Sequence, residues 1–429
     1  MEDIREDAGS IVTAVAREAA AARPVPFPLG LERLGLPTWA IPVGLGLLAA
    51  IVYGLTRQGR VDLDVFVPLA SEGFLHGRLY LVEERTWFSE VIPRLGGGWY
   101  VPYPPVPALA VVPFVLVVGE MFDQGSAAAI YGGANVALLW ILLARIAVPP
   151  RTRTLLTLGF AFGTVHWWAA GTGDAWPFAQ VVAVTFSLLG LIFAVRREHP
   201  ILAGICLGLA AGSRLPIGLT FPLYVALYAG LSFPVHREQF RRERFVPVAR
   251  FLSGLAMPFL LLAAYNVARF GDPIDFGYDR IPGVLQEPWF SSGILSLDYI
   301  PRHIHAMLLR SFDFVEEPPW FRPNWTSTSL LITTPVYLWL IKARSRRPLV
   351  AYGWLAVALA LVPIMTHGSV GFSQFGYRFS LDVAAILWLL LGWVFRRGLS
   401  REAVVAIALG IAVNAYGVWA VTEANFVSY

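Results

Sequence analysis

The chain has 429 residues, of which 56% are hydrophobic and 14% charged, with 33 Lys and Arg against 29 Asp and Glu. The apolar residues fall in blocks of roughly 13 to 20 separated by arginine-rich breaks, which indicates an all-α polytopic membrane protein and gives no sign of a nucleic-acid partner. The one cysteine, Cys206, lies inside an apolar block and excludes a disulfide framework and a thiolate metal site.

The first 37 residues mix acids and arginines, so we expect residues 1–37 to form a cytoplasmic segment rather than a cleavable signal. We expect residues 38–421 to form a single membrane domain with about eleven transmembrane helices, followed by an external tail at 422–429. The expected spans cover residues 38–57, 127–146, 153–171, 176–195, 201–213, 216–233, 250–267, 328–343, 349–366, 379–395 and 402–421.

Five breaks between these spans are rich in arginine, at 145–153, 196–197, 236–244, 342–347 and 396–401. The positive-inside rule allows all five to be cytoplasmic at once, which puts the long loops 58–126 and 268–327 outside an inner, plasma-type membrane. This topology requires the stretch 103–119, with its four prolines, to be a broken or membrane-edge helix. The alternative is that 103–119 crosses the membrane, in which case every basic break lies outside.

Two acids, Asp62 and Asp64, begin the first external loop in the stretch "VDLDVF". Phe66, Ala70 and Phe74 follow at four-residue spacing, which predicts a short amphipathic juxtamembrane helix. Asp64 is well placed to cap this helix. Asp62 lies outside the cap, and because an unpaired carboxylate near an apolar boundary is costly, we expect it to have a function.

Further charged residues fall on the same expected face. Asp174 occupies the short turn between the third and fourth spans, where the alternative is that it caps the fourth span. Arg214 lies at the tight turn between two short spans, and its planar guanidinium suits a phosphate or a carboxylate, although a snorkelling arginine at a helix end is the alternative. Arg378 precedes the tenth span and is a second candidate for phosphate binding.

Aromatic residues surround these charges, which suits sugar stacking and a membrane interface equally well. The histidines on the expected outward half lie at 76, 166, 303, 305 and 367, and the i,i+2 spacing of His303 and His305 does not align them on one helix face. A histidine metal site is therefore not indicated. A divalent cation held by oxygen ligands between Asp62 or Asp174 and a phosphate fits the pattern, but no spacing requires one, and no other cofactor is implied.

The acids, the short helix, the proline-rich stretch and the deep arginines together resemble the integral-membrane glycosyltransferases of the GT-C class, in the family of aminoarabinose transferases and protein O-mannosyltransferases. Asp62, Phe66 and Gly77 fit the spacing of that family's first external loop, and 103–105 resembles its membrane-edge proline motif. Two features depart from the family: the second acid is displaced by one residue, and Pro102-Tyr103 stand where the aminoarabinose transferases have Glu-Lys.

This resemblance implies an inverting transferase that moves a sugar from a polyprenyl phosphate to a hydroxyl on a lipid, glycan or protein outside the membrane. It implies Asp62 as the general base, assisted by Asp64 or Asp174. The implied phosphate contacts are Arg214, Arg378, Tyr103 and Arg280, and the implied substrate contacts are Tyr100, Tyr278 and Tyr377. The alternative is a transporter or flippase for a lipid-linked sugar, against which the chain shows no internal repeat.

Overall fold

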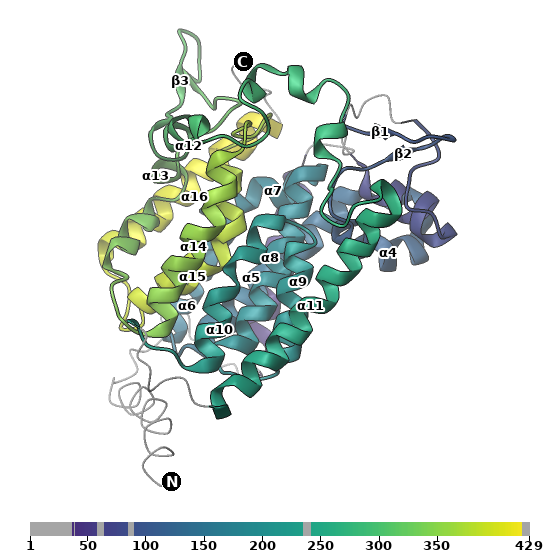
Figure 1. Ribbon diagram of the computed structural model, residues 1–429. Coiled ribbons are helices and arrows are strands. Elements are labelled where there is room, and N and C mark those ends of the chain that lie inside the picture. The colour runs from purple at the N-terminus through teal and green to yellow at the C-terminus, as the bar shows by residue number, and fades with distance from the viewer. Residues whose placement is uncertain (1–36, 38, 58–63, 85–89, 235–241, 423–429) are drawn as a thin grey trace.

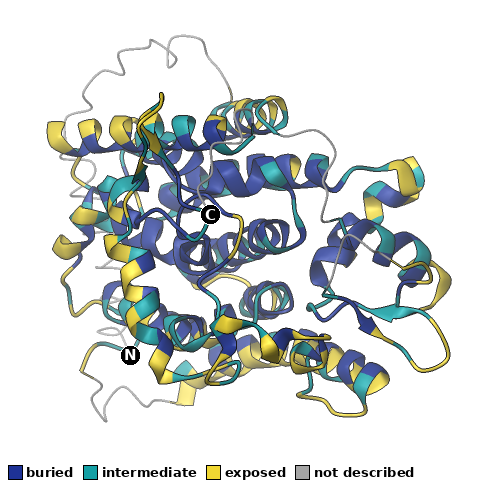
Figure 2. Cartoon of the chain, turned by 90° about the horizontal axis from the view of Figure 1, so that it is seen from above, coloured by how far each residue is buried: buried dark blue, intermediate teal, exposed yellow. Residues whose placement is uncertain are grey.

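The computed structural model describes residues 37, 39–57, 64–84, 90–234 and 242–422, which are mostly helical (Figure 1). The expected segment 1–37 and tail 422–429 lie outside the described residues except for Pro37 and Thr422, and Asp62 also lies outside them. Buried residues fill the inside of the helix bundle and exposed ones lie on its rim (Figure 2).

Helices occupy all eleven segments that were expected to cross the membrane. They are α2 (Ala40–Leu55), α5 (Gln124–Arg145), α6 (Pro150–Phe162) with α7 (His166–Thr172), α8 (Ala175–Ala194), α9 (Pro200–Ala211), η5 (Leu215–Thr220) with α10 (Phe221–Ala229), α11 (Arg242–Phe270), α13 (Leu330–Thr333) with η12 (Pro335–Lys342), α14 (Pro348–Thr366), α15 (Leu381–Val394) and α16 (Arg401–Thr422). The chain is an integral membrane protein.

Five of these helices, α5, α8, α11, α14 and α16, are each long and apolar enough to cross a membrane. The remaining segments are shorter or interrupted, such as α15 with 14 residues and the 3₁₀ helix η12 with 8. A 3₁₀ helix rises about 2.0 Å per residue against about 1.5 Å in an α-helix. Segments containing 3₁₀ turns therefore cover more depth than their residue count indicates.

The remaining elements lie in the loops. Before α5 these are α3 (Phe66–Pro68), η2 (Leu69–Gly73), η3 (Phe74–His76), β1 (Ile92–Pro93), β2 (Trp99–Tyr100), α4 (Val106–Val118) and η4 (Gly119–Met121). After α11 they are η7 (Tyr278–Arg280), η8 (Val284–Gln286), η9 (Pro288–Phe290), η10 (Leu297–Tyr299), α12 (Ile300–Ile304), η11 (His305–Leu309), β3 (Asp313–Phe314), β4 (Phe321–Arg322) and η13 (Arg378–Ser380). Both strand pairs are antiparallel, with Ile92 opposite Tyr100 and Asp313 opposite Arg322.

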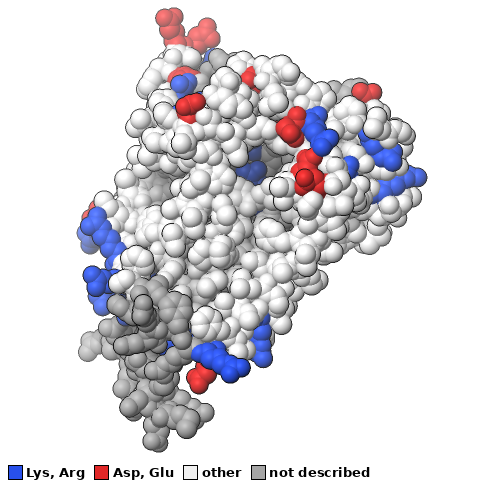
Figure 3. All heavy atoms as spheres, viewed as in Figure 1, with Lys and Arg blue, Asp and Glu red and all other residues white. Residues whose placement is uncertain are grey.

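The described residues of the basic breaks lie at one end of the bundle, here called the basic end. Arg145 pairs with Glu198, which joins the first break to the second. The backbone N–H of Phe233 donates to Arg346 across 3.3 Å, and the guanidinium of Arg347 lies 5.1 Å from the ring centroid of Trp393. Figure 3 shows Lys and Arg over the lower part of the molecule, below a broad uncharged band. The end opposite the basic end is called the site end.

Helix α4 begins and ends at the site end, so it does not cross the bundle. The N–H of Val106 donates to the carbonyl of Gly212, beyond the far end of α9. Past the C-terminus of α4, Asp123 caps α5 and pairs with Arg57, which follows α2. The chain therefore returns to the end from which it entered, as expected for a stretch 103–119 that does not cross; its position at the membrane edge stays a prediction.

The helix predicted at Phe66, Ala70 and Phe74 is present, but it is not amphipathic at a surface. Phe66 and Ala70 are fully buried as expected, whereas Ser71, expected on another face, is only 4% exposed. Part of the helix is a π-helix, whose wider turn rotates the faces away from a four-residue repeat. The segment also packs between α4 and α8, so apolar neighbours cover most of its circumference.

Helices α9 and α11 cross at two glycines. A Cβ added at Gly204 would lie 2.1 Å from the carbonyl oxygen of Phe251, and one added at Gly254 would lie 2.1 Å from that of Ile201. Small residues let two backbones approach closely, which is a common packing mode inside membranes. This crossing places the end of α9, and with it Arg214, against the rest of the bundle.

Candidate functional site

The site end holds a buried ion pair between Arg214 and Asp382. Arg214 follows α9, and Asp382 is the second residue of α15. The Nη2 of Arg214 donates to Oδ2 of Asp382 at 2.9 Å and Nε donates to Oδ1 at 3.1 Å, which makes the pair bidentate. The Asp382 side chain is fully buried, whereas that of Arg214 is 22% exposed. Nη1 of Arg214 makes no hydrogen bond to any residue that the structure describes, so this nitrogen can serve a ligand.

A second arginine, Arg378, lies beside this pair with one donor unused. Its Nε donates to Oε1 of Gln374 at 2.8 Å, and its guanidinium carbon lies 5.0 Å and 5.6 Å from the ring centroids of Phe379 and Trp176. Arg378 is 6% exposed, and among the described residues its buried Nη1 has no hydrogen-bond partner. Burial and the neighbouring Arg214 lower the pKa of Arg378 to about 10, which leaves it protonated at neutral pH.

Gln180 of α8 ties the two arginines together. Its side-chain nitrogen donates to the backbone oxygen of Arg378 at 3.0 Å and to Oδ1 of Asp382 at 3.3 Å. Arg378 is thus held near the buried carboxylate of Asp382, which forms its ion pair with Arg214. A buried donor without an acceptor is costly, so an anion that accepted from Nη1 of Arg378 would be stabilised here.

The carboxylate of Glu90 faces the same region. The indole nitrogen of Trp176 donates to Oε2 of Glu90 at 3.1 Å and to the hydroxyl of Tyr103 at 2.6 Å. Burial raises the pKa of Glu90 to about 7, with Glu287 adding to this effect and the Trp176 hydrogen bond and Arg378 opposing it. Glu90 was not among the predicted site residues, although it is an isolated acid in the run "WFSEVIP" of the first long loop.

Of the three acids predicted to be catalytic, Asp64 and Asp174 lie in the described residues. Gln124 forms hydrogen bonds to both segments that carry them. Its Oε1 accepts from the N–H of Phe66 at 3.1 Å, and its Nε2 donates to the carbonyl of Gly173 at 2.7 Å. Asp64, two residues before Phe66, accepts from the N–H of Val67 at 3.3 Å, which is the capping contact considered from sequence. Asp174 occupies the N-cap position of α8, but its side chain makes no capping hydrogen bond.

Of the predicted binding aromatics, Tyr103 and Tyr278 lie in this region. Tyr103 packs against Phe66 with ring centroids 6.2 Å apart. Tyr278 packs edge-on against His367, and burial together with Glu90 raises its pKa. Figure 3 shows a hollow in the upper half of the molecule with basic side-chain atoms inside it.

Three predicted residues are engaged in other contacts. Tyr377 is fully buried and hydrogen-bonded to Nδ1 of His303 at 2.7 Å, so it supports the loop rather than lining an open surface. Arg280 is half exposed and pairs with Asp275. Tyr100 packs between Tyr80 and Phe270. An aromatic belt near the membrane explains such residues without a ligand.

Among the described residues, no group of three or more His, Cys, Asp or Glu is placed to hold a metal ion. His303 and His367 are neutral structural residues, because burial lowers the pKa of each to about 4. His303 bonds to the backbone oxygen of His367 at 2.8 Å, which fastens α12 to the 367–378 loop. The question of a divalent cation at Asp62 falls outside the described residues.

A comparison with solved structures finds similar folds. The chain is similar to ArnT from Cupriavidus metallidurans bound to undecaprenyl phosphate, with a TM-score of 0.52 and 15% identity over 89% of this chain and 64% of that one. It also matches the archaeal oligosaccharyltransferase AglB from Archaeoglobus fulgidus in complex with an inhibitory peptide and a dolichol-phosphate, with a TM-score of 0.48 and 12% identity over 90% of this chain and 56% of that one.

The likeness to ArnT shows a GT-C-like fold, and the chain spans 64% of the length of that structure. No model of a protein family matches the chain, and no curated protein sequence does so.

Proposed function

We propose that this protein transfers a sugar from a polyprenyl phosphate to a hydroxyl acceptor, with inversion at the anomeric carbon, on the side of the membrane that the site end faces. The observation that carries the proposal is the unpaired, buried Nη1 of Arg378 next to the ion-paired Arg214. Two adjacent guanidinium groups with donors to spare suit a phosphate better than a neutral ligand.

The GT-C-like fold supports this proposal, because the similar ArnT structure holds undecaprenyl phosphate. In the proposed reaction the acceptor oxygen attacks the anomeric carbon, the bond from that carbon to the phosphate oxygen breaks, and its electron pair leaves with the polyprenyl phosphate. Arg214 and Arg378 stabilise the charge that builds up on the leaving phosphate. The acceptor proton passes to Asp62, assisted by Asp64 or Asp174.

The remaining residues and partners are proposed as follows. Tyr103 and Tyr278 line the approach to the two arginines, and the lipid tail enters beside α4. The basic end lies in the cytoplasm by the positive-inside rule, so the site end faces outward from the inner membrane. The acceptor is a lipid, glycan or protein hydroxyl, and no cofactor is needed beyond a divalent cation that oxygen ligands at Asp62 or Asp174 could share with the phosphate.

The test is a turnover assay on the purified protein in lipid with a panel of undecaprenyl-phosphate sugars. Release of free undecaprenyl phosphate is measured for the wild type, Asp62→Asn, Arg378→Gln and the matched control Arg310→Gln, which removes an arginine paired with Asp313 in the loop. We expect Arg378→Gln to lower turnover about 100-fold, Asp62→Asn to abolish it while donor binding persists, and the control to be unchanged.

Three outcomes would redirect the proposal. If no donor in the panel binds or turns over, a transporter becomes the better hypothesis and flux in liposomes is the next assay. If Asp62→Asn retains full turnover, the base is Asp64 or Asp174. If chelation with EDTA abolishes turnover and Mg²⁺ restores it, the divalent cation is required.

A further inference from the structure

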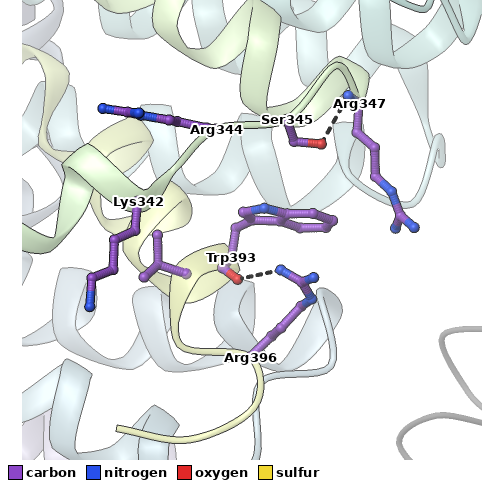
Figure 4. A pocket seen from close by; sticks show the side chains of 7 residues that line it. Lys342, Arg344, Ser345, Arg347, Trp393 and Arg396 are labelled. Carbon is purple, nitrogen blue, oxygen red and sulfur yellow. Dashed lines mark hydrogen bonds between the residues drawn. The ribbon is translucent and has the colours of Figure 1, made fainter. Parts of the chain in front are cut away.

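A cavity of about 350 Å³ opens at the basic end, far from the proposed transferase site. Its lining includes four basic side chains, Lys342, Arg344, Arg347 and Arg396, and the indole of Trp393. They come from three elements: the end of η12, the turn before α14, and the end of α15 with the residues that follow it. Figure 4 shows the two nearest guanidinium groups, of Arg347 and Arg396, beside the Trp393 ring.

The geometry brings like charges together around one ring. The guanidinium carbon of Arg396 lies 4.0 Å and that of Arg347 lies 5.1 Å from the centroid of Trp393. The Nη1 of Arg396 donates to the backbone oxygen of Trp393 at 3.0 Å, which fixes that side chain in place. The indole attracts each cation, but the two cations repel each other unless an anion lies between them.

Three of the basic side chains have no acidic ion-pair partner within the described part of the chain. Lys342, Arg344 and Arg347 form no ion pair with any acid that the structure describes. Glu402 is close enough to Lys342 to sense its charge, but its carboxylate bonds to Ser400. The positive-inside rule accounts for basic residues at this end. It does not account for their convergence on one cavity built around a tryptophan.

The surroundings of the cavity indicate where the anion comes from. Leu338 and Ile341, four residues and one residue before Lys342 in η12, are 56% and 66% exposed. Exposed apolar side chains next to a basic cavity fit a molecule with a phosphate at one end and acyl chains at the other. A free phosphate would gain nothing from them.

We propose that this cavity binds the phosphodiester headgroup of an anionic phospholipid in the leaflet at the basic end, with its acyl chains along η12. Arg347 and Arg396 hold the phosphate from two sides of Trp393, and Lys342 and Arg344 lie at the rim. The proposal concerns a different end of the molecule from the transferase site and does not depend on that function.

The test is native mass spectrometry of the detergent-purified full chain titrated with phosphatidylglycerol or phosphatidylcholine. The variant Arg347→Gln/Arg396→Gln is compared with Arg151→Gln/Arg250→Gln, which removes two exposed arginines from α6 and α11 without touching the cavity. We expect the wild type and the control to retain phosphatidylglycerol, and the cavity variant to bind it at least about tenfold more weakly. If the cavity variant does not fold, Lys342→Gln/Arg344→Gln takes its place, because both side chains are exposed.

Two results would overturn the proposal. An equal loss of phosphatidylglycerol binding in the cavity variant and in the control would show that binding depends only on the overall charge of the surface. Displacement of the lipid by millimolar glycerol 3-phosphate would show that the cavity binds soluble phosphates without using the acyl chains.

Discussion

Arg214 and Asp382 are separated by 168 residues in the chain and form a bidentate ion pair at the site end. The pair links the turn after α9 to the start of α15, and Gln180 links it to α8. Its two members differ in exposure to solvent. The Asp382 side chain is fully buried, whereas the Arg214 side chain is 22% exposed. This asymmetry has a consequence for stability.

Removing the arginine should destabilise the protein more than removing the acid. Arg214→Gln leaves a fully buried carboxylate without its partner, which costs about 3–5 kcal/mol, whereas Asp382→Asn leaves an arginine that can still reach water. The measurement is the shift in unfolding temperature in detergent. Arg145→Gln is the control, because it breaks the exposed pair with Glu198 and should cost less than about 1 kcal/mol. Equal shifts for Arg214→Gln and Asp382→Asn would contradict the prediction.

Glu90 should weaken anion binding when it is ionised. Its pKa of about 7 means that the carboxylate is largely charged at pH 8 and largely neutral at pH 6. A negative charge near Arg378 competes with a phosphate for the same guanidinium. Glu90→Gln should therefore raise the affinity for undecaprenyl phosphate several-fold at pH 8, on the order of 1 kcal/mol, and change it little at pH 6.

The affinity is measured with radiolabelled undecaprenyl phosphate at both pH values. Titration of the phosphate itself changes the affinity of every variant, so Glu316→Gln, which removes an exposed acid in the loop, serves as the reference. An affinity ratio of Glu90→Gln to Glu316→Gln that is the same at pH 6 and pH 8 would show that Glu90 does not sense the bound phosphate.

The helices and the basic end could be predicted from sequence, because apolar blocks and arginine-rich breaks are local patterns. The convergence of residues such as Arg145, Arg346 and Arg396 at one end follows from alternating crossings alone. The site could be predicted only in part. Arg214 and Arg378 stood out as charges in apolar surroundings, but no local pattern pairs Arg214 with Asp382 or brings Glu90 to Trp176.

Two features of burial could not be predicted from the sequence, for physical reasons. The helix after Asp64 looked amphipathic because its apolar residues repeat every four positions, yet a π-helical turn and the cover of α4 bury its polar side too. The burial of Tyr377, an implied substrate contact, was also not foreseen, because its hydroxyl bonds to His303 in the core. In both cases tertiary contacts, which sequence periodicity does not report, decided the burial.

The α9–α11 crossing should be sensitive to a single methyl group. Gly204→Ala places a Cβ 2.1 Å from the Phe251 carbonyl oxygen, so the helices must separate, at a cost of about 1–3 kcal/mol. Gly44→Ala is the matched control in α2, because nothing lies within 4 Å of its added Cβ. Replacing a helical glycine by alanine where space allows should be neutral or stabilising by about 0.5–1 kcal/mol. Unfolding temperatures that rise in both variants would refute the close crossing.

The raised pKa of Glu90 also predicts how stability varies with pH. A carboxyl whose folded pKa is about 7 against 4.5 unfolded binds more protons when folded, so its stabilisation is complete below pH 4.5 and is lost as pH rises through 7. His303 and His367, with pKa values lowered to about 4, act in the opposite sense, because folding excludes their protons. A wild-type curve alone therefore mixes contributions of both signs.

Comparing the wild type with Glu90→Gln isolates the carboxyl, because glutamine resembles its protonated form at every pH and the two histidines are common to both proteins. We expect the two unfolding temperatures to be close at pH 5 and the variant to become the more stable protein at higher pH, with the difference growing up to about pH 7 and levelling off above it. The measurement is thermal unfolding without ligand from pH 5 to 8. A temperature difference that stays constant across this range would mean that Glu90 titrates at its ordinary pKa, which would also remove the basis for its pH-dependent effect on phosphate binding.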